Sequence, residues 1–70
     1  MSGVEHYRRL YPRGSRLELL EDMEDPYTPK KAGDILTVSR IDDGGNIHGI
    51  WDSGGSLSII IGVDRFRLVQ

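Results

Sequence analysis

The chain has 70 residues, no cysteine, and a formal net charge of −2 at pH 7. This length allows one domain with a small hydrophobic core, and the missing thiols exclude disulfides, zinc-thiolate centres and cysteine nucleophiles. The slight negative charge disfavours a protein that neutralises phosphates along a duplex. No segment reaches the roughly 20 apolar residues of a membrane span. We therefore expect a cytoplasmic protein without a membrane partner.

The start of the chain predicts a short helix followed by a connector. Ser2 and Glu5 have the spacing of a capping box. A helix from about Gly3 to Tyr11 follows, and Pro12 and Gly14 end it. A helix this short is unstable alone, so it must pack on the rest of the chain or on another copy. A second copy would also supply apolar contact that a small core lacks, so a homo-oligomer is one expected state.

The rest of the chain predicts short antiparallel strands. Apolar and polar side chains alternate within these segments, and turn residues separate them. This pattern indicates strands over residues 16–21, 35–41, 47–51, 56–61 and 66–69. On the first two strands we expect Leu17 and Leu19, and then Leu36 and Val38, to face the core, with Ile41 on the opposite face.

The connections between these strands complete the fold prediction. Residues 22–33 contain two prolines and form a long irregular loop. Tyr27 lies in an extended stretch between these prolines, where it either packs on the core, the commoner role, or faces a ligand. A break of about one turn covers residues 62–65. The fold class is therefore mainly β: a small five-stranded SH3-like antiparallel barrel, whose closure removes sheet edges. We expect two parts, the N-terminal helix and connector at 1–14 and the barrel at 15–70.

The stretch "IDDGGNIHGIWDSGGSL" is either a cluster for chemistry or a pair of tight turns. Its aspartates and His48 could bind a metal ion, but their spacing matches neither a calcium loop nor a zinc helix, and no strand-to-helix elbow exposes a serine nucleophile. Aspartate, glycine and asparagine are the residues that hairpin turns require. We therefore expect no catalytic residue, metal or cofactor, and structural turns at Asp42, Asp43, Gly44, Gly45, Gly54 and Gly55.

Four segments together carry a family resemblance: "YPRGSRLELLEDMEDPYTP", "AGD", "IDDGGNIHGIWDSGGSL" and "GVDRF". In this order they resemble a small bacterial and phage family catalogued as the domain of unknown function number four-three-one-four. The resemblance runs from about Tyr11 to Phe66. It implies an SH3-like barrel and a setting in phages, prophages and other mobile elements, and it implies no reaction. The chain departs from the family pattern at Leu36, where a glycine is usual, and at Gly49, where a larger residue is usual.

The leading functional expectation is a non-catalytic binding module that works by stoichiometric capture. Guanidinium groups beside aromatic rings suit a nucleotide or another phosphorylated small molecule, and in a phage this ligand would be a defence signal that the protein sequesters. Trp51 is either a core residue, the commoner role for a lone tryptophan, or a platform for the ligand. The predicted surface, with arginines from a neighbouring subunit, comprises Tyr27, His48, Trp51, Asp52, Ser56, Arg8, Arg9 and Arg13.

Two alternatives remain open at this point. A protein-interaction module would bind a host factor or a peptide through the barrel groove or through the acidic block. Reversing the charges of Glu21, Asp22 and Glu24 should abolish that binding and leave nucleotide capture intact. Binding of RNA or DNA by a small barrel is the weaker candidate, and a steep salt dependence would identify it.

Overall fold

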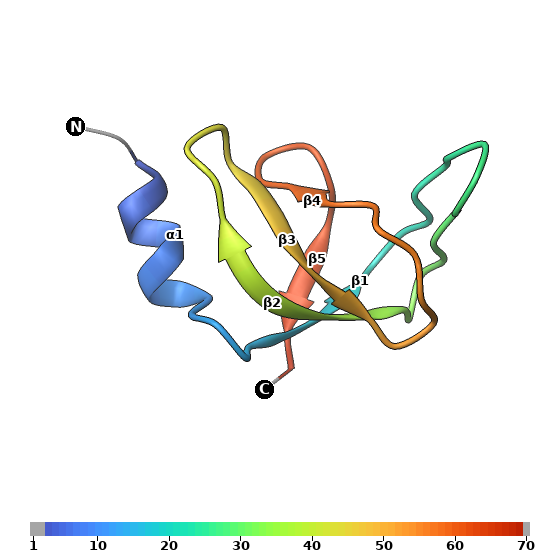
Figure 1. Cartoon of the computed structure of the whole chain (residues 1–70), viewed down its shortest axis with the longest axis horizontal. Helices are drawn as coiled ribbons and strands as arrows, with labels where there is room; N and C mark the ends of the chain where they lie inside the picture. Colours follow the sequence, from blue (N-terminus) through green and yellow to red (C-terminus); the bar gives the residue numbers. More distant parts are fainter. Residues whose placement is uncertain (1–2, 70) are drawn as a thin grey trace.

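The computed structural model describes residues 3–69. The fold is mainly β, with five antiparallel strands in one sheet of order β4-β3-β2-β1-β5 and one short helix (Figure 1). The predicted capping residue Ser2 lies outside the described residues, and Gly3 occupies the N-cap position. In chain order the elements are α1 (Val4–Leu10), β1 (Arg16–Leu19), β2 (Ile35–Ile41), β3 (Asn46–Trp51), β4 (Ile59–Ile60) and β5 (Phe66–Leu68).

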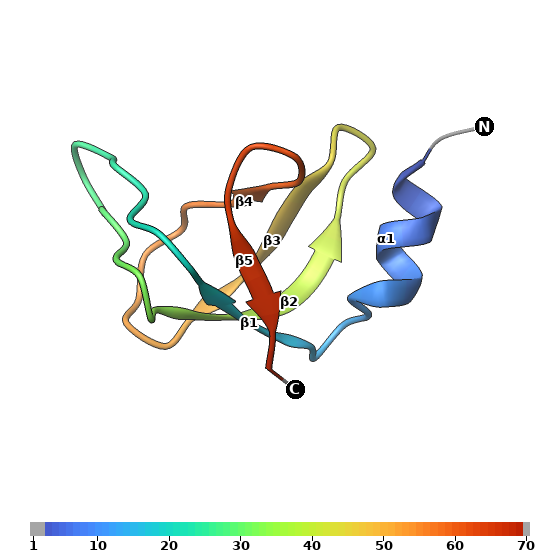
Figure 2. The same ribbon diagram turned by 180° about the vertical axis from the view of Figure 1, so that it is seen from behind.

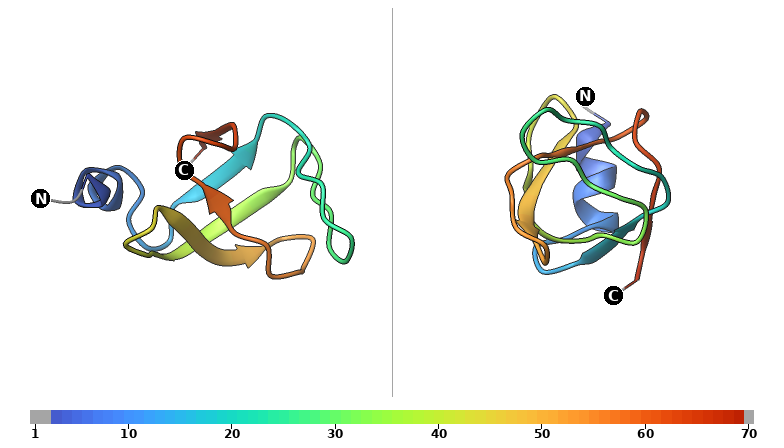
Figure 3. Two further views of the ribbon diagram at one scale, coloured as in Figure 1. Left: turned by 90° about the horizontal axis from the view of Figure 1, so that it is seen from above. Right: turned by 90° about the vertical axis from the view of Figure 1, so that its right-hand side faces the viewer.

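The sheet curls around the core but does not close, so the expected closed barrel is wrong on this point (Figure 3). The strands β4 and β5 are consecutive in the chain and form opposite edges of the sheet. Seen from behind, β5 runs beside β1, with which it pairs (Figure 2). At the other edge the carboxylate of Asp64 accepts a hydrogen bond from the Ile60 amide at 2.8 Å. That donor is therefore unavailable for pairing β4 with another strand.

The core is built from apolar side chains on the inner face of the sheet. Leu17, Leu19, Leu36 and Val38 are buried, which confirms the expected alternation on β1 and β2. Ile41 is also buried, contrary to expectation, because the pairing of β2 with β3 shifts register between Val38 and Arg40. Such a bulge adds one residue to a strand and reverses the side-chain alternation beyond it. The remaining buried apolar residues are Val4, Met23, Ile47, Trp51 and Ile59.

The helix and the long loop lie at opposite ends of the molecule, whose extents are 34 × 23 × 17 Å (Figure 1). Residues 20–34 form this loop between β1 and β2, and the backbones of Met23 and Lys30 pair across it. Tyr27 lies beyond this pair and is 89% exposed, so the expected packing of Tyr27 on the core is wrong. The cause is a local turn in which Asp25 Oδ2 accepts hydrogen bonds from the amides of Tyr27 and Thr28, at 2.9 and 2.7 Å.

Two further features complete the fold. The strand expected over 56–61 is reduced to the two residues of β4, while Leu57 and Ile61 still pack against the core. Within residues 3–69 no helix has both the length and the apolar character that crossing a membrane requires.

Candidate functional site

The aspartates of the β2–β3 turn act on the backbone of the turn itself. Asp42 Oδ1 accepts hydrogen bonds from the amides of Gly44 and Asn46 at 3.0 and 2.9 Å. Asp42 Oδ2 lies 2.9 Å from His48 Nε2 and accepts a hydrogen bond from Asn46 Nδ2 at 3.1 Å. The His48 ring, followed by the Asn46 groups, holds the pKa of the Asp42 carboxyl well below its usual range. Among residues 3–69 no three histidine or carboxylate side chains gather around a position for a metal ion.

Acid should destabilise the protein through Asp42. Its folded-state pKa is depressed, so the stability it contributes is present above its unfolded pKa of about 3.9 and is lost as the pH falls through the folded value. We expect the free energy of unfolding, measured by urea denaturation at a series of pH values, to decrease below about pH 4. An Asp42→Asn variant should show a weaker decrease, whereas Glu21→Gln, which removes an exposed carboxylate that forms no ion pair with any of residues 3–69, should follow the wild type. Equal acid dependence in wild type and Asp42→Asn would contradict the role of this carboxylate.

Arg8, which was predicted to bind the ligand, bonds instead to other residues of its own chain. Its Nε and Nη2 atoms donate to the carbonyl oxygen of Ile41 at 3.0 and 2.8 Å. Nη2 also donates to Asp43 at 3.0 Å, and Nη1 donates to Glu5 on the same helix. The side chain therefore ties α1 to the β2–β3 hairpin, and most of its donors are occupied.

Trp51 lies in the core, which answers the question its sequence position raised. It is 2% exposed, and its Nε1 atom donates a hydrogen bond to the carbonyl oxygen of Leu57 at 2.6 Å. A platform on which a ligand ring stacks needs an exposed face, and Trp51 has none. The adjacent Asp52 forms an ion pair with Arg16 at 2.5 Å, and Ser56 is exposed in the segment that follows.

The predicted surface is therefore not assembled in one place. His48 and Asp52 are four residues apart along and beyond β3, about 13 Å in an extended strand. His48 lies on β3 and contacts Asp42 of the β2–β3 turn, whereas Tyr27 is at the tip of the long loop. Arg9 is exposed on α1.

Lys30 is a structural residue that the sequence reasoning missed. It is 4% exposed, and its Nζ atom lies 5.3 Å from the centroid of the Trp51 ring. Nζ donates to Ser53 Oγ at 3.1 Å and to the carbonyl oxygen of Gly54. A cation over an aromatic face is attracted by its electrons, so Lys30 ties the long loop to the segment after β3. No pattern in the sequence distinguishes Lys30 from its neighbour Lys31.

A groove between the connector after α1 and strand β2 brings arginines together. Its volume is about 170 Å³. Backbone hydrogen bonds fix the connector on β2, from Gly14 N to Val38 O and from Val38 N to Ser15 O, both at 2.8 Å. The apolar lining comes from the core-facing side of β2 and from the end of the helix, and arginines form the rim. The lining residues are Arg8, Tyr11, Pro12, Arg13, Val38, Arg40 and Ile41.

The rim arginines differ in how much of their charge is already neutralised. Arg8 is paired with two carboxylates. Arg13 and Arg40 are exposed, and neither forms an ion pair with any of residues 3–69. Arg13 was among the predicted ligand residues, whereas Arg40 was not, because only the bulged pairing of β2 shows where its side chain emerges. The groove can therefore offer two guanidinium groups to an anion above an apolar floor.

Comparison with known proteins identifies a family and no function. No curated protein and no solved structure matches the chain. The model of the family described as domain of unknown function (DUF4314) matches residues 1–69, which extends the resemblance beyond the strands to include α1. The chain therefore belongs to the DUF4314 family.

Proposed function

We propose that the protein is a non-catalytic binding module that captures a phosphorylated small molecule in the groove between α1 and β2. The observation that carries the proposal is the pair of exposed arginines, Arg13 and Arg40, without ion-pair partners among residues 3–69. Planar guanidinium groups match the oxygens of a phosphate and can bind it with two hydrogen bonds each. Charge in this groove thus favours an anion although the whole chain is slightly acidic.

The lining of the groove supports a ligand with an apolar or aromatic part. Tyr11 and Pro12 contribute ring surface beside the arginines, and Val38 and Ile41, which are 2% and 5% exposed, close the groove below them. A volume of about 170 Å³ is below the roughly 300–1,000 Å³ of pockets that enclose a drug-sized ligand. The groove would therefore hold the phosphate and leave part of a nucleotide at the surface, where the ring of Tyr11 is half-buried.

Capture without turnover fits this set of side chains. Arginine, tyrosine, proline and aliphatic residues bind and orient a phosphate, whereas hydrolysis needs a positioned base or metal to activate water. In a phage or another mobile element, the setting that the family resemblance implies, such a module would lower the free concentration of a host nucleotide signal. This role needs only affinity and abundance.

Binding of ATP compared with adenosine tests the proposal. Titration calorimetry should show binding of ATP and none of adenosine, with affinity that falls as salt rises. NMR amide shifts should concentrate at Tyr11, at Arg13 and at residues 38–41. The double variant Arg13→Gln and Arg40→Gln should weaken ATP binding about tenfold or more, because charge-assisted hydrogen bonds are lost.

The matched control is Arg65→Gln, which removes the same charge from an exposed arginine outside the groove. It should bind ATP as the wild type does. Equal affinity for adenosine and ATP, or equal weakening by Arg65→Gln, would remove the groove as the binding site.

A further inference from the structure

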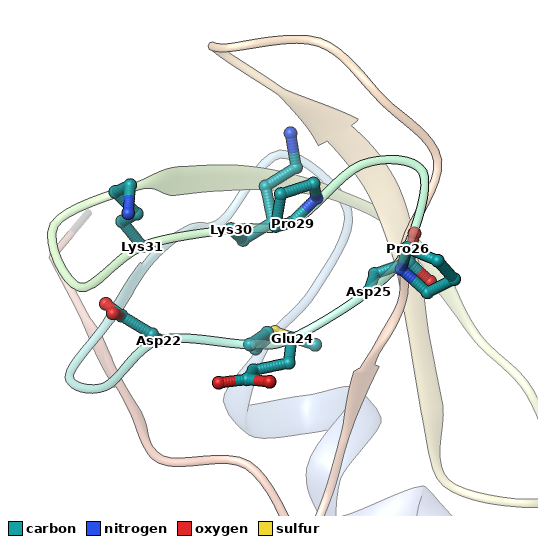
Figure 4. Close-up of a pocket in the computed structure, with 8 residues that line it drawn as sticks. Asp22, Glu24, Asp25, Pro26, Pro29, Lys30 and Lys31 are labelled. Atoms are coloured by element: carbon teal, nitrogen blue, oxygen red, sulfur yellow. The ribbon is translucent and has the colours of Figure 1, made fainter.

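A second cavity lies within the long loop, at the opposite end of the molecule from the groove. Its volume is about 410 Å³. Figure 4 shows acidic residues on one limb of the loop and lysines on the other. Met23 and two prolines supply apolar lining. The lining residues are Asp22, Met23, Glu24, Asp25, Pro26, Pro29, Lys30 and Lys31.

The charges around this cavity are not equally available to a partner. The ammonium of Lys30 is bonded to Ser53 and Gly54, on the segment after β3. Asp25 is engaged by two backbone amides of its own turn, which lower the pKa of its carboxyl. Asp22 accepts one hydrogen bond, from the Ala32 amide at 2.8 Å through Oδ1, so its Oδ2 atom stays available.

Glu24 completes the acidic side of the cavity. It is exposed and forms no ion pair with any of residues 3–69. The cavity therefore presents two available carboxylates, Asp22 and Glu24, beside proline surface, opposed by the single exposed ammonium of Lys31. Tyr27, which is 89% exposed, adds an aromatic ring at the tip of the same loop.

We infer that this cavity takes the arginine-bearing end of a second copy of the chain. The groove offers the guanidinium groups of Arg13 and Arg40, which have no ion-pair partner among residues 3–69, and the cavity offers two carboxylates against one exposed ammonium. Both ends also expose apolar side chains, Tyr27 at one and Leu10 at the other, which is 44% exposed.

The placement of the two surfaces decides the symmetry of the contact. The helix end and the loop end lie at opposite ends of the long axis (Figures 1 and 3). One copy therefore meets the next head to tail, which is a heterologous contact that builds chains or rings. The contact does not depend on phosphate capture. It uses the same arginines, however, so a bound phosphate and a second copy exclude each other.

Two neutralised variants test the inference by analytical ultracentrifugation at low salt. The cavity variant carries Asp22→Asn and Glu24→Gln, and the groove variant carries Arg13→Gln and Arg40→Gln. The wild type should associate, and each variant alone should have a dissociation constant raised about tenfold or more. Mixing the two variants should restore one contact and stop there, giving 1:1 dimers, because each variant keeps the surface that the other lost.

The control is Glu21→Gln, which removes an acidic charge from the same loop without lining the cavity. It should associate as the wild type does. A wild type that stays monomeric across a dilution series, a mixture without dimers, or equal weakening by Glu21→Gln would each overturn the inference.

The same variants separate this inference from the proposed function. At protein concentrations at which the wild type is dissociated, the cavity variant should bind ATP as the wild type does, because its groove is intact. A cavity variant that no longer self-associates but still binds ATP would support the cavity contact independently of the proposed function. ATP added to the wild type should dissociate the assembly. An assembly that ATP binds without dissociating would show that the second copy does not use the groove.

Discussion

Gly49→Ala is expected to lower the free energy of unfolding by about 3 kcal/mol or more, at the upper end of the cost of overpacking. A Cβ atom on Gly49 would overlap the carbonyl oxygen of Thr37 and would lie 2.9 Å from its carbonyl carbon and 3.1 Å from Leu36 Cδ1. The first two atoms belong to the backbone of the neighbouring strand, so the strand itself must move. A chain of this length has a stability of roughly 4–10 kcal/mol, which makes the loss a large fraction of the total. Urea denaturation followed by circular dichroism measures it.

Gly54→Ala is the matched control, because it isolates the backbone effect of removing a glycine. Gly54 has φ of +86°, and a Cβ atom there meets nothing within 4 Å. That change should cost about 1–2 kcal/mol from the left-handed backbone alone. Gly49 has no positive φ, so its cost is entirely steric. A cost for Gly49→Ala no larger than that of Gly54→Ala would show that β2 and β3 do not approach as closely as the structure places them.

The strands were predictable because local alternation of side chains decides where they lie. Contacts between strands, such as the one at Gly49, were not predictable in this way. Alternation placed β1, β2 and β3 within a few residues of their observed bounds. The bulge in β2 that buries Ile41 depends on how two strands meet. Alternation within a single strand carries no information about the register of its partner. The steric limit on residue 49 is thus set by the carbonyl of Thr37 on the adjacent strand.

The edges of the sheet illustrate a second limit. A closed barrel was expected because five strands and their turns fit one. Whether β4 pairs with a further strand depends on a single amide, that of Ile60, and the side chain of Asp64 occupies it. Aspartate near a turn commonly bonds to backbone amides, but the sequence does not show which amide it takes.

The candidate site divides in the same way. The role of Asp42 in its own turn follows from neighbours within six positions. The contacts of the other predicted residues join distant positions: Arg8 and Ile41 are 33 positions apart in the sequence, and Arg16 and Asp52 are 36 positions apart. The spacing of residues in the sequence indicates on which face of a strand a charged side chain lies. It does not indicate which residue that side chain contacts. The groove at Arg13 and Arg40 emerges only once those partners are known.

Trp51→Ala should leave the protein largely unfolded. Truncating a buried aromatic residue costs about 3–5 kcal/mol, which is comparable with the lower part of the stability expected for a chain of this length. The ring is 2% exposed, and its Nε1 atom holds the segment after β3 through the Leu57 carbonyl. Without the ring, the buried ammonium of Lys30 also loses its aromatic partner. Far-ultraviolet circular dichroism during urea denaturation measures the change, since the variant has no tryptophan to report it.

Trp51→Phe separates the packing of the ring from its hydrogen bond. Phenylalanine keeps an aromatic face for the core and for Lys30, and it loses the donor to Leu57, so the expected cost is about 1–3 kcal/mol for an unsatisfied buried acceptor. In the wild type, the buried indole should be poorly quenched by acrylamide, and ATP should leave its fluorescence unchanged because the groove lies elsewhere. A Trp51→Ala variant with wild-type stability and no ATP binding would make Trp51 a ligand platform after all, and would move the binding site from the arginine groove to β3.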